Sequence, residues 1–294
     1  MRQTDTWALG PMLAVAVALG CVAPSLAHAQ QAAPAGEPVC LPPKPTPAFF
    51  QALQERLLTP GKTFNLRDLP PDAMKQIGAH LQDAAARQAR DWPALCYYAE
   101  KNAAVLNGGR RPHVIFMGDS ITENWLAADP AMFSPSILDR GISGQTAPQM
   151  LLRMYADVIN LRPDIVHIMA GTNDIFGNTG PETDQTIVDH IRAMIVLAKA
   201  NGVKVVLGSI TPSAGWKMRP DFNPSARIIH VNALLRQLAT EQRVVFVDYH
   251  TPLAGDGGGM HGGLANDGLH PNRDGYAIMR PLAQRAIVQA EKQP

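Results

Sequence analysis

The sequence lacks an excess of charge of either sign. It has 26 Lys and Arg residues against 25 Asp and Glu residues, a formal net charge of +1, and no basic run long enough to follow a phosphate backbone. Hydrophobic residues make up 46% of the 294 residues and charged residues 17%, which is enough apolar material for a full core. Nucleic acid is therefore not an expected partner, and the composition is not that of a disordered chain.

Long apolar runs are absent after the first 29 residues, so no transmembrane span is expected in the mature form. Residues 1–29 read as an export signal, with a short polar start, an apolar stretch from Trp7 through Leu26 and the small-x-small sequence Ala27-His28-Ala29. Cleavage after this sequence predicts a mature protein that begins at Gln30 and is periplasmic or secreted.

Cysteine is scarce, and its three copies bear on anchoring and on redox state. Ala18-Leu19-Gly20-Cys21 resembles the pattern that receives lipid in lipoprotein signals, so a protein lipid-anchored through Cys21 is the alternative to simple cleavage. Cleavage after Ala29 leaves Cys40 and Cys96, an even pair that favours a disulfide in an oxidising compartment. The alternative is two buried free thiols.

The pattern along the chain divides it into an N-terminal extension and a larger domain. Residues 30–48 are rich in Pro, Ala and Gln and predict a linker. Residues 48–58 and 72–106 carry apolar positions at helical spacing. We expect a linker and helical extension over 30–91 and the main domain over 92–294.

From residue 113 onward, short apolar runs alternate with helical patterns. The expected strands are 113–117, 137–141, 164–170, 203–210 and 244–248. The expected helices are 146–159, 181–201, 225–241 and 273–291. This alternation predicts an α/β fold with a parallel sheet covered by helices on both faces. Ligands of such sheets bind at the carboxyl ends of the strands.

A serine follows the first expected strand, and a possible base for it lies near the end of the chain. Ser120 comes directly after Gly118 and Asp119, but a serine hydroxyl is a weak nucleophile unless a base takes its proton and a third group orients that base. In DGLHPNRDGY, Asp267 precedes His270 by three residues in one turn. The spacing predicts Ser120 as nucleophile, His270 as base and Asp267 as its orienting partner.

Acyl transfer also requires hydrogen-bond donors for the developing oxyanion. GISGQT, residues 141–146, follows the second expected strand, and Gly144 can bring its backbone close to a ligand. GTND, residues 171–174, follows the third, and Asn173 can donate through its side-chain amide. We expect an oxyanion hole made by the N–H groups of Ser120 and Gly144 and the amide of Asn173.

Each of these residues also has a purely structural interpretation. Ser120 with Glu123 matches a helix capping box. Asp267 with His270 can be a surface turn, Gly144 a turn glycine, and Asn173 a loop cap. Four such motifs at strand ends and in the last loop, all supplying parts of one reaction, favour the catalytic interpretation.

Several neighbouring polar residues are expected to be structural. Asp119 is predicted to hydrogen-bond the backbone of the nucleophile turn, and Asp174 to play a similar part. His167 lies in an apolar strand and is predicted to be a hydrogen-bonded core residue. His250 and His261 lie in an expected loop at the rim of the site, with His261 as a candidate substrate contact.

The blocks GDSIT, GISGQT, GTND and DGLHP occur in the order of the SGNH hydrolase superfamily, also called GDSL esterases and lipases, and residues 92–290 resemble it. The resemblance implies a three-layer α/β/α sandwich of flavodoxin-like type, with about five parallel strands and no metal or organic cofactor. It implies the same roles for Ser120, Gly144, Asn173, Asp267 and His270. RGISGQTAPQML and GTNDIFGNTG look most like bacterial proteins of the platelet-activating-factor acetylhydrolase-like branch. The one departure, Ile121 in place of Leu, exchanges like for like.

The sequence thus predicts an exported serine hydrolase of carboxylic esters that acts through an acyl-enzyme. The resemblance favours short acyl groups, acetyl especially, on a carbohydrate or a small alcohol. A lipase or lysophospholipase is an alternative, since the loops at 211–224 and 250–263 offer material for an acyl groove. A carbohydrate-binding or envelope protein without turnover is the alternative from another class.

Overall fold

A computed structural model describes Cys40 and residues 47–62 and 72–293. The predicted signal sequence, its cleavage site and Cys21 lie outside the described residues. Within the described residues, no helix has both the length and the apolar character needed to span a membrane.

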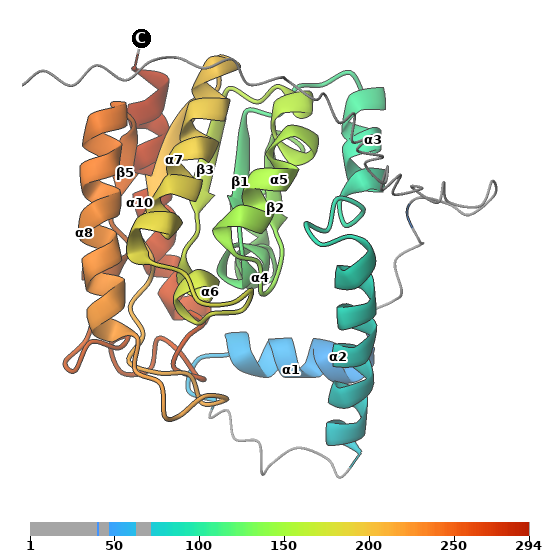
Figure 1. Cartoon of the computed structure of the whole chain (residues 1–294), viewed down its shortest axis with the longest axis vertical. Coiled ribbons are helices and arrows are strands. Elements are labelled where there is room, and N and C mark those ends of the chain that lie inside the picture. Colours follow the sequence, from blue (N-terminus) through green and yellow to red (C-terminus); the bar gives the residue numbers. More distant parts are fainter. Residues whose placement is uncertain (1–39, 41–46, 63–71, 294) are drawn as a thin grey trace, which may run out of the picture. The chain divides into compact units, whose positions relative to one another are not determined.

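The main domain is built on five parallel strands in the order β2-β1-β3-β4-β5 (Figure 1). The strands are β1 (Val114–Gly118), β2 (Ile137–Gly141), β3 (Ile165–Met169), β4 (Lys204–Gly208) and β5 (Val245–Val247). Every strand predicted from the sequence is present, with bounds within one or two residues of those expected. The α/β fold with five parallel strands is therefore confirmed.

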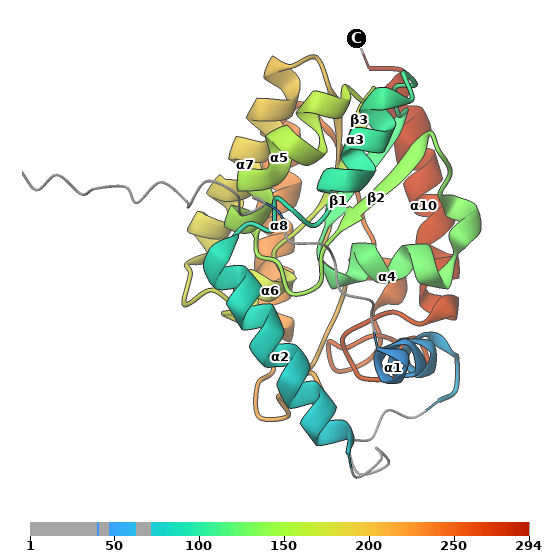
Figure 2. The same cartoon turned by 90° about the vertical axis from the view of Figure 1, so that its right-hand side faces the viewer.

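Helices cover both faces of the sheet, which Figure 2 shows from the side. The longer ones are α4 (Ser120–Ala128), α5 (Ala147–Asp157), α7 (Asp184–Ala200), α8 (Ser225–Gln242) and α10 (Arg273–Glu291). The short ones are η2 (Pro130–Met132), η3 (Ile159–Leu161), α6 (Thr172–Ile175) and α9 (His250–Leu253). The four helices expected in this domain correspond to α5, α7, α8 and α10, whereas no helix was expected at α6 or α9.

Alternation along β1 separates two hydrophobic cores. Ile115 and Met117 belong to a core with α5, α7 and α8. Val114 and Phe116 belong to a core with α4, α9 and α10. All four side chains are fully buried, as expected for a central parallel strand that is covered on both faces. This two-sided packing fixes the carboxyl end of β1, where Ser120 begins α4.

The N-terminal extension contains α1 (Ala48–Leu58) and α2 (Ala73–Arg90), and α3 (Ala99–Asn107) follows it. The helical spacing over 72–106 predicted helix throughout this stretch. The prediction is wrong at 91–98, where a turn separates α2 from α3. The Asp91 carboxylate accepts hydrogen bonds from the Leu95 and Cys96 N–H groups at 2.9 and 2.8 Å, and Pro93 disfavours a continuous helix. Cys40 and Cys96 form a disulfide, the pairing predicted from the sequence.

Candidate active site

Ser120 lies at the turn between β1 and α4. The structure assigns the helix cap to Asp119, whose carboxylate accepts a hydrogen bond from the Ile121 N–H at 2.9 Å. Asp119 therefore hydrogen-bonds the backbone of this turn, as predicted. The alternative interpretation of Ser120 as a cap paired with Glu123 is wrong, because Ser120 is the first residue of the helix and Glu123 accepts from the Ser143 N–H at 2.8 Å.

The close approach of β1 to α4 requires glycine before the turn. A Cβ atom at Gly118 would lie 2.0 Å from Thr122 Oγ1 and 3.0 Å from the Met169 carbonyl oxygen. Only a residue without a side chain allows the strand to pass this close to the first turn of α4. The glycine thus fixes where Ser120 emerges from the sheet.

Ser120, His270 and Asp267 form a continuous chain of hydrogen-bonded side chains. Ser120 Oγ lies 2.9 Å from His270 Nε2, and His270 Nδ1 lies 2.7 Å from Asp267 Oδ2. The other carboxylate oxygen of Asp267 accepts from the N–H groups of Leu269 and His270, each at 2.9 Å. The geometry is that of a nucleophile, a base and a group that orients the base.

The turn between Asp267 and His270 depends on a second glycine. Gly268 has a φ of +89°, and a Cβ atom there would lie 2.7 Å from the Gly215 carbonyl oxygen. Glycine adopts this left-handed conformation without steric cost. The tight turn lets a carboxylate three residues upstream reach the histidine ring.

Electrostatic interactions favour charge on the acid and raise the basicity of the histidine. Burial acts to raise the pKa of Asp267, but His270 and the two backbone N–H groups lower it to about 2. Burial acts to lower the pKa of His270, and the carboxylates of Asp267 and Asp119 outweigh it, so the net pKa is raised. Burial raises the pKa of Asp119, which is 1% exposed, to about 6.

The side chain of Asn178 joins two of the predicted oxyanion residues, Gly144 and Asn173. Asn178 Nδ2 donates to the Gly144 carbonyl at 3.1 Å and to Asn173 Oδ1 at 2.8 Å. Asn173 Nδ2 donates to the Gln145 carbonyl at 2.9 Å and lies 3.3 Å from Asp119 Oδ2. Gly144 has a φ of +80°. Asn178 was not predicted as part of the site. The only signal in the sequence was its position five residues after Asn173.

A fully buried arginine, Arg153, connects the carboxyl end of β1 to the loop that contains Gly144. Arg153 donates through Nη2 to the Gly118 carbonyl at 3.0 Å, through Nε to Gln145 Oε1 at 2.5 Å, and through Nη1 to Asp157 Oδ2 at 2.9 Å. The side chains of Arg153 and Asp157 are both 0% exposed. This pair was not predicted from the sequence, although a charged i, i+4 pair on the apolar face of a helix was a usable signal.

Trp216 makes an additional contact with the acid. Its indole Nε1–H donates to Asp267 Oδ2 at 3.1 Å, and its ring meets that of His270 edge-on at 6.4 Å between centroids. The Lys217 N–H donates to the Asp267 carbonyl at 3.0 Å. The loop at 211–224, which the sequence offered as material for an acyl groove, therefore lies against Asp267 and His270.

The other polar residues singled out in the sequence have distinct positions. Asp174 hydrogen-bonds the backbone at the start of α5, where its carboxylate accepts from the Ala147 N–H at 2.9 and 3.1 Å, while Thr146 is the cap of that helix. His167 is a core residue whose Nε2 lies 2.8 Å from the Tyr249 hydroxyl, while its Nδ1 has no partner among the described residues. Burial lowers the pKa of His167 to about 3, so it is neutral. His250 begins α9, and His261 is exposed.

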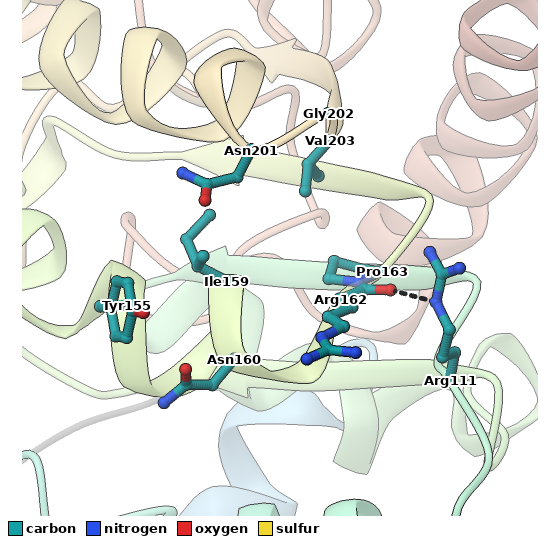
Figure 3. A pocket seen from close by; sticks show the side chains of 9 residues that line it. All are labelled: Arg111, Tyr155, Ile159, Asn160, Arg162, Pro163, Asn201, Gly202 and Val203. Atoms are coloured by element: carbon teal, nitrogen blue, oxygen red, sulfur yellow. Dashed lines mark hydrogen bonds between the residues drawn. The ribbon is translucent and has the colours of Figure 1, made fainter.

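A cavity of about 410 Å³ has none of Ser120, His270 and Asp267 in its lining (Figure 3). Its lining includes residues that precede β1, β3 and β4, among them Arg111, Pro163 and Val203. It therefore lies at the amino ends of the strands, opposite Ser120. Among the described residues, no group of three or more His, Cys, Asp or Glu side chains is placed to hold a metal ion.

Comparison with known proteins identifies the family. A profile of the GDSL-like lipase/acylhydrolase family matches residues 116–278. The structure of a GDSL-like lipase from Bacteroides thetaiotaomicron is 38% identical, with a TM-score of 0.64 over 68% of this chain and 100% of that one. The chain belongs to the GDSL-like lipase/acylhydrolase family.

Two more distant structures share the fold. One, from Streptococcus pneumonia and described as a platelet-activating-factor protein, is 23% identical, with a TM-score of 0.57 over 70% of this chain and 99% of that one. The other is an acetyl xylan esterase at 22% identity, with a TM-score of 0.51 over 59% of this chain and 98% of that one. No curated protein sequence matches the chain.

Proposed function

We propose that this acylhydrolase is an exported serine hydrolase of carboxylic esters, with Ser120 as nucleophile, His270 as base and Asp267 as the group that orients and stabilises the imidazolium. The observation that carries the proposal is the hydrogen-bonded chain from Ser120 Oγ through His270, at 2.9 Å, to Asp267 Oδ2, at 2.7 Å. A purely structural role for Ser120 would not explain why its hydroxyl faces a histidine whose other ring nitrogen is hydrogen-bonded to a buried carboxylate.

The reaction proceeds in two acyl transfers. Ser120 Oγ attacks the ester carbonyl as His270 Nε2 takes its proton, and the same proton then passes to the leaving alcohol, so the acyl group remains on Ser120. A water molecule, deprotonated by His270, then attacks the acyl carbon, the bond to Ser120 Oγ breaks, and His270 returns the proton to Ser120 Oγ as the acid leaves. His270 must be neutral to accept a proton, so activity is expected to fall as pH falls through its raised pKa.

The oxyanion is proposed to bind the N–H groups of Ser120 and Gly144 and the amide of Asn173. The Asn173 nitrogen has two hydrogens. One is held by the Gln145 carbonyl at 2.9 Å, and the contact with Asp119 is the longer at 3.3 Å. The hydrogen facing Asp119 is the one that an oxyanion would take over, while Asn178 keeps the amide oriented.

Asn173→Ala is expected to lower kcat by on the order of a hundredfold, since it removes one oxyanion donor. Initial rates with p-nitrophenyl acetate measure the effect. Asn201→Ala is the matched control, because Asn201 lies at the end of α7 and its side-chain amide donates to the Leu197 carbonyl of the same helix. Equal rates for the Asn173 variant and wild type would remove Asn173 from the oxyanion hole.

A short acyl group, acetyl especially, is the proposed substrate moiety. The Trp216 ring lies beside His270 and is held by the Asp267 carboxylate, so it narrows the space next to the base. The distant structure described as an acetyl xylan esterase shares the fold, which agrees with an acetyl ester of a carbohydrate. A long acyl chain, as in a lipase, would require the loop at 211–224 to lie further from the acid and base.

Hydrolysis of p-nitrophenyl acetate, butyrate and decanoate by wild type and Ser120→Ala tests the function. Turnover is expected to depend on Ser120 and to fall with chain length, since the Trp216 ring beside His270 is proposed to limit the size of the acyl group. Rates that rise toward decanoate would identify a lipase. Equal rates for the two proteins would contradict the hydrolase and favour a binding protein without turnover.

Export is proposed from the predicted signal sequence together with the disulfide between Cys40 and Cys96, a bond typical of oxidising compartments. The mature chain is then expected to begin at Gln30, which N-terminal sequencing of the protein from the periplasm or medium reads directly. A lipid-modified chain that begins at Cys21 would instead support the lipoprotein alternative.

A further inference from the structure

The N-terminal helix α1 contacts the loop that carries the acid and the base. Asn266, the residue directly before Asp267, places Nδ2 at 3.0, 2.9 and 2.7 Å from the carbonyl oxygens of Arg56, Leu57 and Thr59, which share its two hydrogens. These carbonyls lie at the carboxyl end of α1, where a helix leaves its last acceptors without intrahelical partners. Asn266 is only 7% exposed, so these bonds are largely shielded from water.

Three further contacts hold α1 against the domain. Leu58, at the end of α1, is 1% exposed and belongs to the core formed with α4 and α10. Gln54 Nε2 donates to Asn124 Oδ1 of α4 at 2.8 Å. Glu55 forms a two-pronged ion pair with Arg273 at the start of α10, at 2.7 and 2.9 Å. Figure 2 shows α1 beside the loop that enters α10.

The opposite side of the acid is held by the loop at 211–224. Lys217 Nζ donates to the Asn266 carbonyl at 2.7 Å. Ser213 Oγ donates to the Gly268 carbonyl at 2.9 Å. The acid–base loop, residues 266–270, is therefore hydrogen-bonded both to the loop at 211–224 and to α1. The helix lies outside the family match, which begins at residue 116.

We infer that α1 holds the acid–base loop in its reactive geometry, with Asn266 as the positioning residue that joins them. The inference rests on the proposed function of Ser120, His270 and Asp267. One peptide unit separates Asn266 from Asp267, so a shift of Asn266 carries the carboxylate with it. The carboxylate in turn sets the ring of His270 relative to Ser120 Oγ, and displacements of about 1 Å in such a site cost up to about a hundredfold in rate.

The alternative is that Asn266 only anchors α1 and leaves the reaction unaffected. The two roles differ in what they change. A positioning residue alters kcat and the pH dependence of the base, whereas an anchor alters only the melting temperature. His270 faces the carboxylates of Asp267 and Asp119, and these raise its pKa. A loosened loop weakens the first of these interactions, so the acidic limb of kcat/KM moves to lower pH.

Asn266→Ala in the full chain tests the inference with p-nitrophenyl acetate as the substrate. We expect kcat to fall on the order of tenfold, KM to change by no more than about twofold, and the acidic limb to move to lower pH. Glu241→Gln is the control, because it removes an exposed ion pair, that with Arg192, which joins α7 and α8 and makes no contact with α1 or the loop, and its kcat is expected to stay within about twofold of wild type.

Leu58→Ala provides an independent test that leaves the loop sequence intact, and it replaces Asn266→Ala if that variant does not fold. It weakens the packing of α1 against α4 and α10. It is therefore expected to lower kcat and to move the acidic limb of kcat/KM to lower pH, as Asn266→Ala does. A lower melting temperature with wild-type kcat and pH profile in either variant would overturn the inference. Wild-type turnover that does not depend on Ser120 would instead overturn the proposed function, so the two failures are distinguishable.

Discussion

Ser120→Ala is expected to lower kcat by at least about a thousandfold, the loss typical of a removed nucleophile in such a triad. The substitution deletes the oxygen that lies 2.9 Å from His270 Nε2 and leaves the helix cap intact, since Asp119 provides that cap. The fold is therefore expected to survive, and circular dichroism checks it. Initial rates with p-nitrophenyl acetate give the loss.

His270→Ala is expected to lower kcat to the same degree, because Ser120 then has no group to take its proton. The matched controls are Ser134→Ala and His230→Ala. Ser134 is an exposed serine before β2, and His230 is an exposed histidine on α8. Both controls are expected to retain the wild-type rate. A loss below about tenfold in Ser120→Ala or His270→Ala would refute the assignment of that residue.

Arg153→Met is expected to lower the free energy of unfolding by about 3–5 kcal/mol, because it leaves a buried carboxylate without its partner. Arg153 and Asp157 are fully buried, so bulk solvent does not reach the groups that lose their hydrogen bonds. The Gly118 carbonyl and the Gln145 amide lose a donor in the same step. Chemical denaturation at neutral pH measures the change.

The matched control for this prediction is Arg192→Met. Arg192 pairs with Glu241 at 3.0 Å, and both side chains are exposed, at 36% and 40%. Exposed pairs contribute about 0–1 kcal/mol, so the control is expected to lose little stability. An equally small loss for Arg153→Met would mean that the buried network does not support the fold.

The central strands β1 and β3 were predictable because they are buried on both faces. Such strands are short continuous apolar runs, and HVIFM and DIVHIMA have few other interpretations. The carboxyl ends of parallel strands share one edge, so the order of the strands along the chain was enough to assign Ser120, Gly144 and Asn173 to that edge. Asp267 and His270 could be paired because they lie three positions apart within one turn.

Other contacts could not be predicted because they join segments far apart in the chain. Trp216 and Asp267 lie 51 residues apart, and Asn266 and Leu57 lie 209 apart. No local periodicity relates such positions. The cap at α4 was left open between two residues for a different reason, because both Asp119 and Ser120 are good capping residues. The backbone geometry gives the cap to Asp119 and leaves the Ser120 hydroxyl for His270.

The most direct measurement of the central claim is the mass of the protein during turnover. Wild-type protein mixed rapidly with p-nitrophenyl acetate and quenched in acid is expected to carry one added acetyl group. Peptide mapping should place that group on Ser120, and Ser120→Ala should carry none there. An acetyl group on another residue, or turnover in Ser120→Ala at the wild-type rate, would contradict an acyl-enzyme on Ser120.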